Sequence, residues 1–192
     1  MLATGESISG QWLGLSDGAL EFETPWQARW RMPADRVAEI RIRNGKLVYL
    51  PDLEPTAVEE VAYFGRVIPW GRDRGFDGSP PALKGKKPVR ALAMHSRSLI
   101  TFALDEQFAT FKATLGFDDS GGSRGRVACR VTADGRELFA QNDLRAEGDP
   151  VPVEVKVDGA KQLTLEVDFG EHEDIGDRVL WAEPRLFRAK AK

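Results

Sequence analysis

Two adjacent carboxylates are the first residues of the chain whose pattern could support chemistry. Asp118 and Asp119 end a run of alternating apolar residues and precede the flexible stretch Ser120-Gly121-Gly122-Ser123. Adjacent side chains on an extended strand point to opposite faces, so these two cannot act as the paired acid and base of a hydrolase. We expect one carboxylate to cap the loop and the other to face solvent or a ligand.

The sequence offers no other set of catalytic side chains. Cys129 lies in a strand-like pattern with no base nearby. The chain also has no Gly-x-Ser-x-Gly nucleophile elbow, because the two stretches with that spacing, 14–18 and 121–125, are not followed by a helical pattern. The glycine-rich stretch 121–125 is not followed by a helix whose N-terminus would hold a phosphate. We therefore expect a protein that is not an enzyme.

An acidic run near the C-terminus surrounds His172. It consists of Glu166, Asp168, Glu171, Glu173, Asp174 and Asp177. Its spacing does not follow an EF-hand, which needs alternating oxygen ligands, a central glycine and a final glutamate. One cysteine and two histidines are also too few for a zinc cage of nitrogen and sulfur ligands. We expect the run to be a solvated acidic loop.

The composition excludes several classes of protein. The chain has 192 residues, 42% of them hydrophobic and 30% charged, which is typical of one soluble domain or two small ones. The net charge of −3 leaves no excess of basic residues for a phosphate backbone, so we expect no nucleic-acid partner. We also expect no membrane insertion. Residues 1–30 lack the pattern of a secretory signal, although the chain could be a piece of a longer secreted protein.

Short segments of alternating hydrophobicity predict an all-β protein. The clearest are Phe108 to Phe117 and Val151 to Val157, in which every second residue is apolar. Further predicted strands are 98–104, 126–131, 136–140, 162–169 and 179–187. The dipeptides Asp134-Gly135 and Asp158-Gly159 each predict a tight hairpin. Seven or more such strands are typical of a β-sandwich.

Residues 1–47 look like a separate unit. Its four predicted strands are 7–15, 19–24, 27–32 and 37–43, a spacing that suits a small SH3-like or Sm-like β-barrel. Trp12, Trp26 and Trp30 would form its core or the contact between the two units. Asn44-Gly45 is the expected hinge or hairpin that leads into the larger domain.

From Val48 onward, the order of motifs resembles the NPCBM domain, a galactose-binding-like jelly-roll β-sandwich grouped with carbohydrate-binding module family 51. The matching segments are VYLPDLEP (48–55), GRDRGFDGSP (71–80), MHSRS (94–98), FKATLGFDDSGGSRGRVACRVTADGRELF (111–139), GDPVPVEVKVDGAKQLTLEVDFG (148–170) and WAEPRL (181–186). The resemblance covers residues 48–188 and leaves 189–192 as a tail. It implies a non-catalytic module that binds a terminal galactose-type sugar, within a larger extracytoplasmic bacterial protein.

Two departures from the family pattern bear on this function. Ala91 and Ala93 stand where the family has glycines, which would reshape a loop near the ligand. Arg178 and Leu180 stand where the family has a histidine and an aspartate. The loss of hydrogen-bonding groups favours an alternative from another class, namely a structural or protein-interaction module that has lost its sugar site.

The resemblance implies a sugar site on the loops that carry His95, Asp118 and Asp119. His95 would donate to a sugar hydroxyl, and Trp70 or Trp181 would offer a flat stacking face. The structural alternative makes His95 a hydrogen-bonded loop residue and the tryptophans part of the core.

The same resemblance implies a structural calcium ion held by Asp77, Ser79 and Glu183. Hard cations need six to eight oxygen ligands, which an Asp-Gly turn and a second carboxylate help to supply. The alternative is a plain Asp77-Gly78 turn and an exposed glutamate.

Overall fold

The structure is a computed structural model that describes residues 6, 8–38, 40, 46–171 and 173–189. The chain divides into two compact units, Met1–Arg43 and Asn44–Lys192. The division falls four residues before the boundary at 47/48 expected from the sequence, because Leu47 already pairs with the last strand of the second unit. The predicted hinge at Asn44-Gly45 lies outside the described residues.

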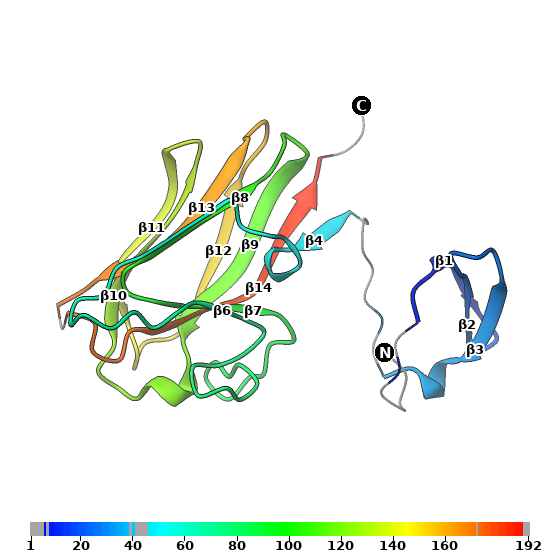
Figure 1. Ribbon diagram of the computed structural model, residues 1–192, viewed down its shortest axis with the longest axis horizontal. Coiled ribbons are helices and arrows are strands. Elements are labelled where there is room, and N and C mark those ends of the chain that lie inside the picture. The colour runs from blue at the N-terminus through cyan, green and yellow to red at the C-terminus, as the bar shows by residue number, and fades with distance from the viewer. Residues whose placement is uncertain (1–5, 7, 39, 41–45, 172, 190–192) are drawn as a thin grey trace. The chain divides into compact units, whose positions relative to one another are not determined.

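The described part of the first unit is a three-stranded antiparallel sheet in the order β1-β2-β3 (Figure 1). Its strands are β1 (Gln11–Ser16), β2 (Ala19–Glu23) and β3 (Arg29–Pro33), and a short 3-10 helix, η1 (Ala34–Arg36), follows them. Asp17 and Gly18 join β1 to β2 with positive φ angles of 48° and 69°, as a tight hairpin requires. Three of the four predicted strands are thus confirmed, and most of the fourth, 37–43, lies outside the described residues.

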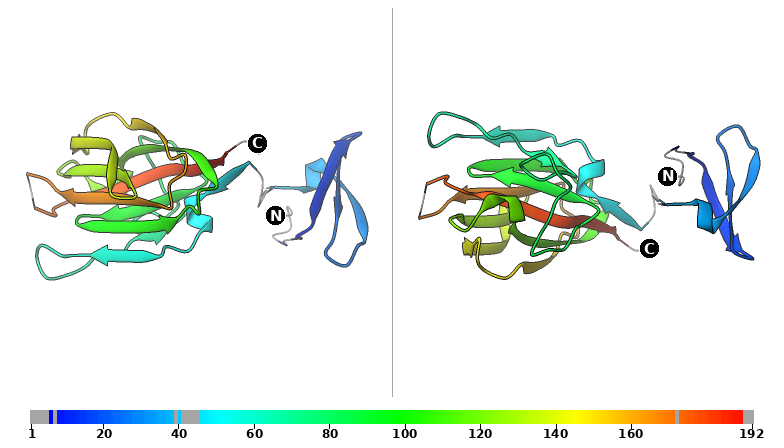
Figure 2. Two further views of the ribbon diagram at one scale, coloured as in Figure 1. Left: turned by 90° about the horizontal axis from the view of Figure 1, so that it is seen from above. Right: turned by 90° about the horizontal axis from the view of Figure 1, so that it is seen from below.

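The second unit is a β-sandwich of two antiparallel sheets (Figure 1), and Figure 2 gives two further views of it. One sheet has the order β11-β10-β13-β8-β5, and the other has the order β12-β9-β14-β7-β6 with β4 added beside β14. Their bounds are β4 (Leu47–Tyr49), β5 (Ala57–Glu60), β6 (Gly71–Arg72), β7 (Ala91–His95), β8 (Ser98–Ala103), β9 (Phe108–Phe117), β10 (Arg126–Ala133), β11 (Arg136–Arg145), β12 (Val151–Lys156), β13 (Gln162–Phe169) and β14 (Arg178–Arg188). Two 3-10 turns, η2 (Leu50–Asp52) and η3 (Asp119–Gly121), complete the unit.

Alternating hydrophobicity located most of these strands. β9 and β13 have the bounds that the sequence predicts. In β9, Phe111, Ala113 and Leu115 are buried while the residues between them are partly exposed, as a period of two requires. One core of buried side chains from both sheets fills the sandwich, and the all-β prediction is confirmed.

The two Asp-Gly turns have different outcomes. Asp134-Gly135 forms the predicted hairpin, because Ala133 pairs directly with Arg136 across it. Asp158-Gly159 also forms a turn, closed by a hydrogen bond from Ala160 N to Val157 O, but it is not a hairpin. It carries the chain from β12 in one sheet to β13 in the other. The prediction of a second hairpin was wrong, because a turn sequence fixes the local reversal and not the strand that pairs next.

β7 was not predicted from the sequence, because its residues do not alternate between apolar and polar. All five of its residues are buried, because one face covers the main core and the other is covered as well. Leu92 and Met94 face the main core, and Ala91 and Ala93 lie on the outer face with Leu180 of β14. A strand buried on both faces reads as a continuous apolar run and not as an alternation.

Candidate functional site

An open cleft of about 730 Å³ lies at the end of the sandwich where β7 ends and β14 begins. Described residues from four loops, which follow β5, β6, η3 and β13, line it together with the end of β7 and the start of β14. The lining residues that the structure describes are Phe64, Arg66, Ile68, Phe76, His95, Gly121, Gly122, Ser123, Arg124, Asp174, Ile175, Gly176 and Arg178. Its size is that of an ordinary small-molecule site. We call it the His95 cleft.

His95 and Arg178 lie side by side in the cleft because strand pairing places them opposite one another on β7 and β14. Burial lowers the pKa of His95 below its usual value of 6.5, so the ring is neutral at pH 7. Its Nδ1 lies 2.9 Å from the carbonyl oxygen of Ser96, which can only accept, so Nδ1 carries the proton. Nε2 of the neutral ring is therefore a hydrogen-bond acceptor, whereas the sequence analysis expected a donor.

Four apolar side chains, Phe64, Ile68, Phe76 and Ile175, form the part of the cleft lining that we call its floor. The residues that depart from the family pattern support Phe76 and do not line the cleft themselves. Ala91, Ala93 and Leu180 form a small buried cluster on the outer face of β7 and β14, and Phe76 packs against it. The ring of Phe76 also meets His95 edge to face, with centroids 6.2 Å apart. The two alanines lie in a strand and not in a ligand loop, and their methyl groups pack against Leu180 instead of closing the site.

The rim of the cleft carries three arginines and one carboxylate. Arg178 donates from Nη1 to the carbonyl of Ser120 at 2.9 Å, and it packs so closely on Gly121 that an added Cβ there would lie 3.2 Å from the Arg178 Cβ. Arg66 and Arg124 are exposed and have no hydrogen bond or ion pair with any other described residue. Asp174 accepts a hydrogen bond from Tyr63 N at 3.3 Å, which ties two of the loops together.

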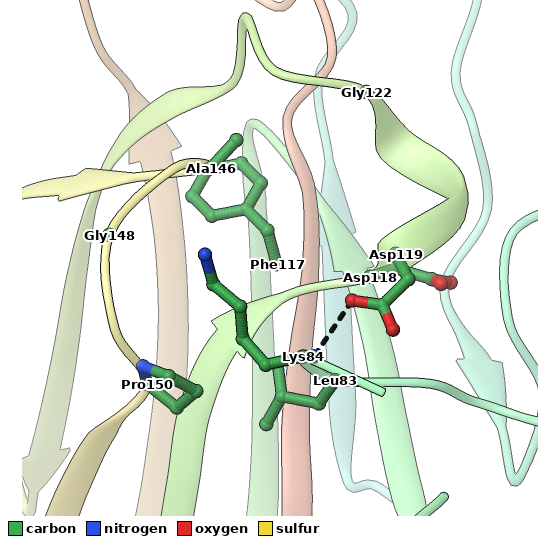
Figure 3. A pocket seen from close by; sticks show the side chains of 9 residues that line it. All are labelled: Leu83, Lys84, Phe117, Asp118, Asp119, Gly122, Ala146, Gly148 and Pro150. Carbon is green, nitrogen blue, oxygen red and sulfur yellow. Dashed lines mark hydrogen bonds between the residues drawn. The ribbon is translucent and has the colours of Figure 1, made fainter. Parts of the chain in front are cut away.

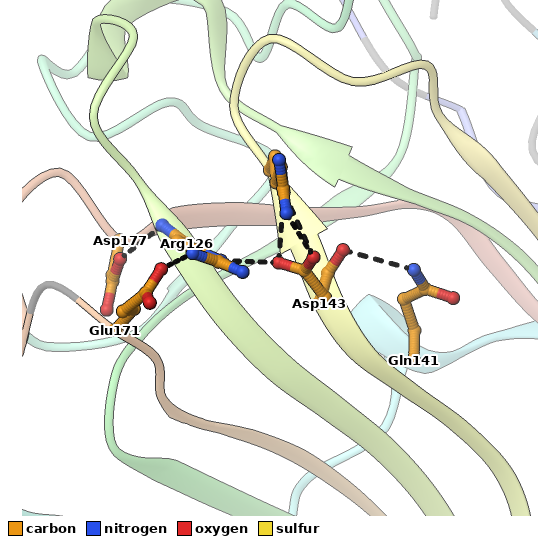
Figure 4. A network of polar contacts seen from close by, with 6 residues as sticks. Arg126, Gln141, Asp143, Glu171 and Asp177 are labelled. Carbon is orange, nitrogen blue, oxygen red and sulfur yellow. Dashed lines mark hydrogen bonds and ion pairs between the residues drawn. The ribbon is translucent and has the colours of Figure 1, made fainter.

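Asp177, a fully buried carboxylate, lies in the chain between two lining residues of the cleft, Gly176 and Arg178. It accepts hydrogen bonds from Ser96 Oγ at 2.5 Å and from Arg126 N at 3.1 Å, so it joins the end of β7 to the start of β10. Figure 4 shows how the network continues through the Arg126 side chain to Asp143 and Glu171. Two arginines, Arg145 first and Arg126 second, hold the pKa of Asp143 well below its usual range.

The acidic run is therefore not one solvated loop, and that expectation was wrong for Asp177 in particular. Glu166 and Asp168 both pair with Arg130 on the neighbouring strand β10, and Glu171 pairs with Arg126. Among the described residues, no three His, Cys, Asp or Glu side chains gather as a metal site. His172 lies outside the described residues.

Asp118 and Asp119 line a smaller pocket of about 200 Å³ and not the His95 cleft (Figure 3). The two pockets share only Gly122 among their described lining residues. The carboxylate of Asp118 caps η3 by accepting from Ser120 N at 3.1 Å, which confirms the predicted loop cap, and it also accepts from Phe76 N at 3.0 Å. That loop passes so close that a Cβ on Gly75 would lie 2.7 Å from Asp118 Oδ2.

The carboxylate of Asp119 also accepts hydrogen bonds from backbone amides. Its two carboxylate oxygens accept from Lys84 N at 2.7 Å and Gly85 N at 2.8 Å. Both aspartates therefore hold the 75–85 loop in place. Asp119 remains exposed enough to meet solvent, as the sequence analysis expected of one member of the pair.

The two tryptophans expected as stacking faces lie outside the described lining of the cleft. Trp181 has no exposed surface and belongs to the main core, so its ring is not available to a sugar, and that expectation was wrong. Trp70 is half-buried, packs on the core, and has the Arg72 guanidinium 5.0 Å from its ring centroid. Sequence reasoning missed Phe64, Phe76, Arg66 and Arg124, because nothing in a loop sequence shows which loops converge.

The residues expected to bind calcium form hydrogen bonds in two places: Asp77 and Ser79 hold the 75–79 turn, and Glu183 holds the backbone at 89–90. Asp77 is exposed, and hydrogen bonds from the hydroxyl and the amide of Ser79 lower its pKa. Ser79 O accepts from Gly75 N at 2.7 Å. Glu183 lies at a break in the β14 register with φ of 51°, and its Oε1 accepts from Val89 N and Arg90 N at 2.9 Å and 3.3 Å.

Comparison with known families identifies the second unit. Residues 46–187 match the model of the NPCBM/NEW2 domain, so the chain belongs to this family. The match spans nearly the whole sandwich and leaves the first unit outside it.

Solved structures with the same fold include a single module and fragments with more than one domain. The CBM51 module of a Clostridium perfringens GH95 protein, solved in complex with methyl-galactose, has a TM-score of 0.65 and 21% identity over 73% of this chain and 99% of that one. The tandem CBM51 modules of the family 98 glycoside hydrolase Sp3GH98 from Streptococcus pneumoniae give 0.68 and 18% over 76% of this chain and 48% of that one. A C. perfringens ZmpB fragment, whose CBM51-2 module is in complex with GlcNAc, gives 0.65 and 16% over 98% of this chain and 40% of that one.

A curated sequence relative is the putative endo-alpha-N-acetylgalactosaminidase of Renibacterium salmoninarum, which is 29% identical over 91 residues. The match covers 47% of this chain and only 6% of the length of that relative. In the part of the chain that the structure describes, no helix has the length and apolar character needed to cross a membrane.

Proposed function

We propose that the second unit is a non-catalytic carbohydrate-binding module and that its sugar binds in the His95 cleft. The observation that supports this most strongly is the composition of the cleft, in which an apolar floor around Phe76 and Ile68 lies beside an imidazole, a hydroxyl, a carboxylate and guanidinium groups. Sugars present apolar C–H faces and many hydroxyls, so they need this combination of surfaces. The neutral His95 ring supplies an acceptor, Asp174 a second acceptor, and Ser123 and Arg178 supply donors.

A galactose-type ring is the first ligand to test, because a relative of the same fold was solved with methyl-galactose. In this proposal the chain belongs to a longer extracytoplasmic protein whose other domains carry any catalytic activity. The R. salmoninarum relative and the multidomain C. perfringens protein that pairs an M60 catalytic domain with CBM51 modules support that arrangement.

Calcium belongs to this proposal as a structural ion. Asp77 and Glu183 would supply carboxylate oxygens, and backbone carbonyls and water would complete the six to eight oxygens that the ion requires. When bound, the ion would supply positive charge that holds the 75–85 loop and the β14 bulge in place.

Titration calorimetry of the full chain against methyl galactoside, together with a broad glycan array, tests the sugar site. We expect dissociation constants of about 10 µM to 1 mM, as an open site with few contacts gives. His95→Ala should weaken binding about tenfold through loss of one hydrogen bond and of ring contact. Asp134→Ala, in the hairpin at the far end of β10, is the matched control and should bind normally. If no glycan binds at millimolar concentration, the alternative of an interaction module replaces this proposal.

A further inference from the structure

The charge on the rim of the His95 cleft is unbalanced. Among its described lining residues are Arg66, Arg124 and Arg178, against Asp174 alone. Burial also keeps His95 neutral at pH 7, so the ring does not change this balance. The whole chain, in contrast, carries a net charge of −3. Positive charge is therefore concentrated in a cleft of an otherwise acidic protein.

Six arginines elsewhere in the sandwich have carboxylate partners within 4.0 Å: Arg72, Arg90, Arg97, Arg126, Arg130 and Arg145. Four further described arginines, Arg74, Arg136, Arg185 and Arg188, have no such partner, but none of them lines the His95 cleft. Arg66 and Arg124 have no carboxylate partner among the described residues, and Arg178 donates only to a neutral carbonyl. A guanidinium is a planar fork of donors that matches two oxygens of a carboxylate or a sulfate. These three side chains are thus left with unused donors that face one cleft.

We propose that the His95 cleft selects a sugar that carries a negative charge, in the form of a carboxylate or a sulfate ester. The inference rests on the proposed function, since it names the class of sugar that the same site would bind. The apolar floor and His95 would hold the neutral ring, while Arg66, Arg124 and the remaining donors of Arg178 would hold the anionic group. A cleft with low-dielectric walls strengthens this attraction, because it concentrates the field of its charges.

Galactose and galacturonic acid form a matched pair for the test, because they differ only in the oxidation of the C6 hydroxymethyl group to a carboxylate. Calorimetry on the full chain measures the affinity for methyl galactoside, methyl galacturonide and galactose 6-sulfate. The first ligand reports the contribution of the neutral ring, and the other two report the added contribution of a carboxylate or a sulfate. We expect at least one anionic sugar to bind about tenfold or more tightly than methyl galactoside, which is the range for hydrogen bonds to charged groups. Its affinity should fall as salt rises, while that of methyl galactoside should not change.

The double variant Arg66→Gln/Arg124→Gln assigns the effect to the rim. It should lower the affinity for the anionic sugar about tenfold and leave methyl galactoside within about threefold. Arg136→Gln is the matched control, because Arg136 is another exposed arginine on the hairpin at the opposite end of β10 and should have no effect. Circular dichroism and melting temperature confirm that each variant is folded.

Three outcomes would overturn the inference, and they differ in what they leave standing. If methyl galactoside binds as tightly as both anionic sugars, the charge preference is wrong and the proposed sugar site stands. If an anionic sugar binds more tightly than methyl galactoside, but the double variant binds it as tightly as the unchanged protein does, residues outside the rim of the cleft recognise the charge. If neither kind of sugar binds and a glycan array is also negative, the proposed function fails together with this inference.

Discussion

The two units of this chain use their large apolar side chains in opposite ways. In the first unit, the strand registers place Trp12, Phe22 and Trp30 in a row across three strands, yet Trp12 and Trp30 remain 44% and 43% exposed. In the second unit, Trp181 is completely buried between two sheets. The first unit is built by local hairpins alone, and only Ala19, Leu20 and Thr24 are buried among its described residues.

The difference shows that pairing strands and building a core are separate events. Hairpins bring residues together that are close in sequence, so a short chain can form them without a second layer. A core needs a second sheet, and in the sandwich that sheet comes from strands far apart in the sequence, such as β8 and β14. We therefore expect stability to depend on the sandwich and to be nearly independent of the first unit.

The largest expected effect is that of Trp181→Ala. Removal of a fully buried ring leaves a cavity and should lower the free energy of unfolding of the sandwich by about 3–5 kcal/mol. Trp30→Ala, on the exposed row of the first unit, should change it by less than about 1 kcal/mol. Urea denaturation followed by circular dichroism measures both. Equal losses would mean that the two units share one core.

Asp177→Ala tests the buried polar link of the sandwich. The change removes the acceptor for Ser96 Oγ and Arg126 N. Because these donors would be left without a partner, the free energy of unfolding should fall by about 2–4 kcal/mol. Asp143→Ala is the control, because it removes an exposed carboxylate of the same network and should cost less. A larger loss for Asp143 in the same urea experiment would contradict this account of the network.

Calcium should stabilise only the second unit. An ion that binds the folded state alone stabilises it by mass action, so excess chelator should lower the melting temperature by about 5 °C relative to excess calcium. Asp77→Asn combined with Glu183→Gln should abolish the difference. Scanning calorimetry gives the measurement, and identical melting temperatures for the unchanged protein would remove calcium from the proposal.

The pH dependence of the free energy of unfolding near neutrality should also arise in the second unit. Burial lowers the pKa of His95 in the folded state below about 6.5, its value in the unfolded chain. The unfolded state then binds more protons as the pH falls from about 6.5, so stability is complete above this pH and decreases toward the folded pKa. His95→Gln should flatten the curve of unfolding free energy between about pH 7 and 5. A curve unchanged by this substitution would assign the slope to other groups.

Removal of residues 1–43 should have the smallest effect. Among the described residues of the second unit, Leu50 is the first member of the main core, and Val48 packs at its edge. The fragment 44–192 should therefore melt within about 3 °C of the full chain. A much larger decrease would show that the two units unfold as one cooperative body.

Much of the fold could be read from the sequence because β-strands with one buried face have a period of two. That pattern predicted β9 and β13 to the residue, and Asp134-Gly135 predicted its hairpin. It missed β7, which is buried on both faces, and it could not show that Asp158-Gly159 connects two different sheets.

The site was less predictable, because its residues come from loops that meet only in three dimensions. His95 was identified, and the structure places it in the cleft. Asp118 and Asp119 were also singled out, but their carboxylates bind the amides of the 75–85 region and line another pocket. Trp181 was offered as a stacking face, although its position in the middle of a buried strand places it in the core.

The sequence by itself determined the all-β class, the family resemblance and the position of most strands, because these depend on local periodicity and on the order of motifs. Only the tertiary structure decided which carboxylates hold loops and which side chains remain free for a ligand. It also brought Arg66, Arg124 and Arg178 to one cleft from three separate segments. The physical reason is that hydrogen-bond partners and burial are properties of neighbours in space, and strand pairing selects these neighbours from distant parts of the chain.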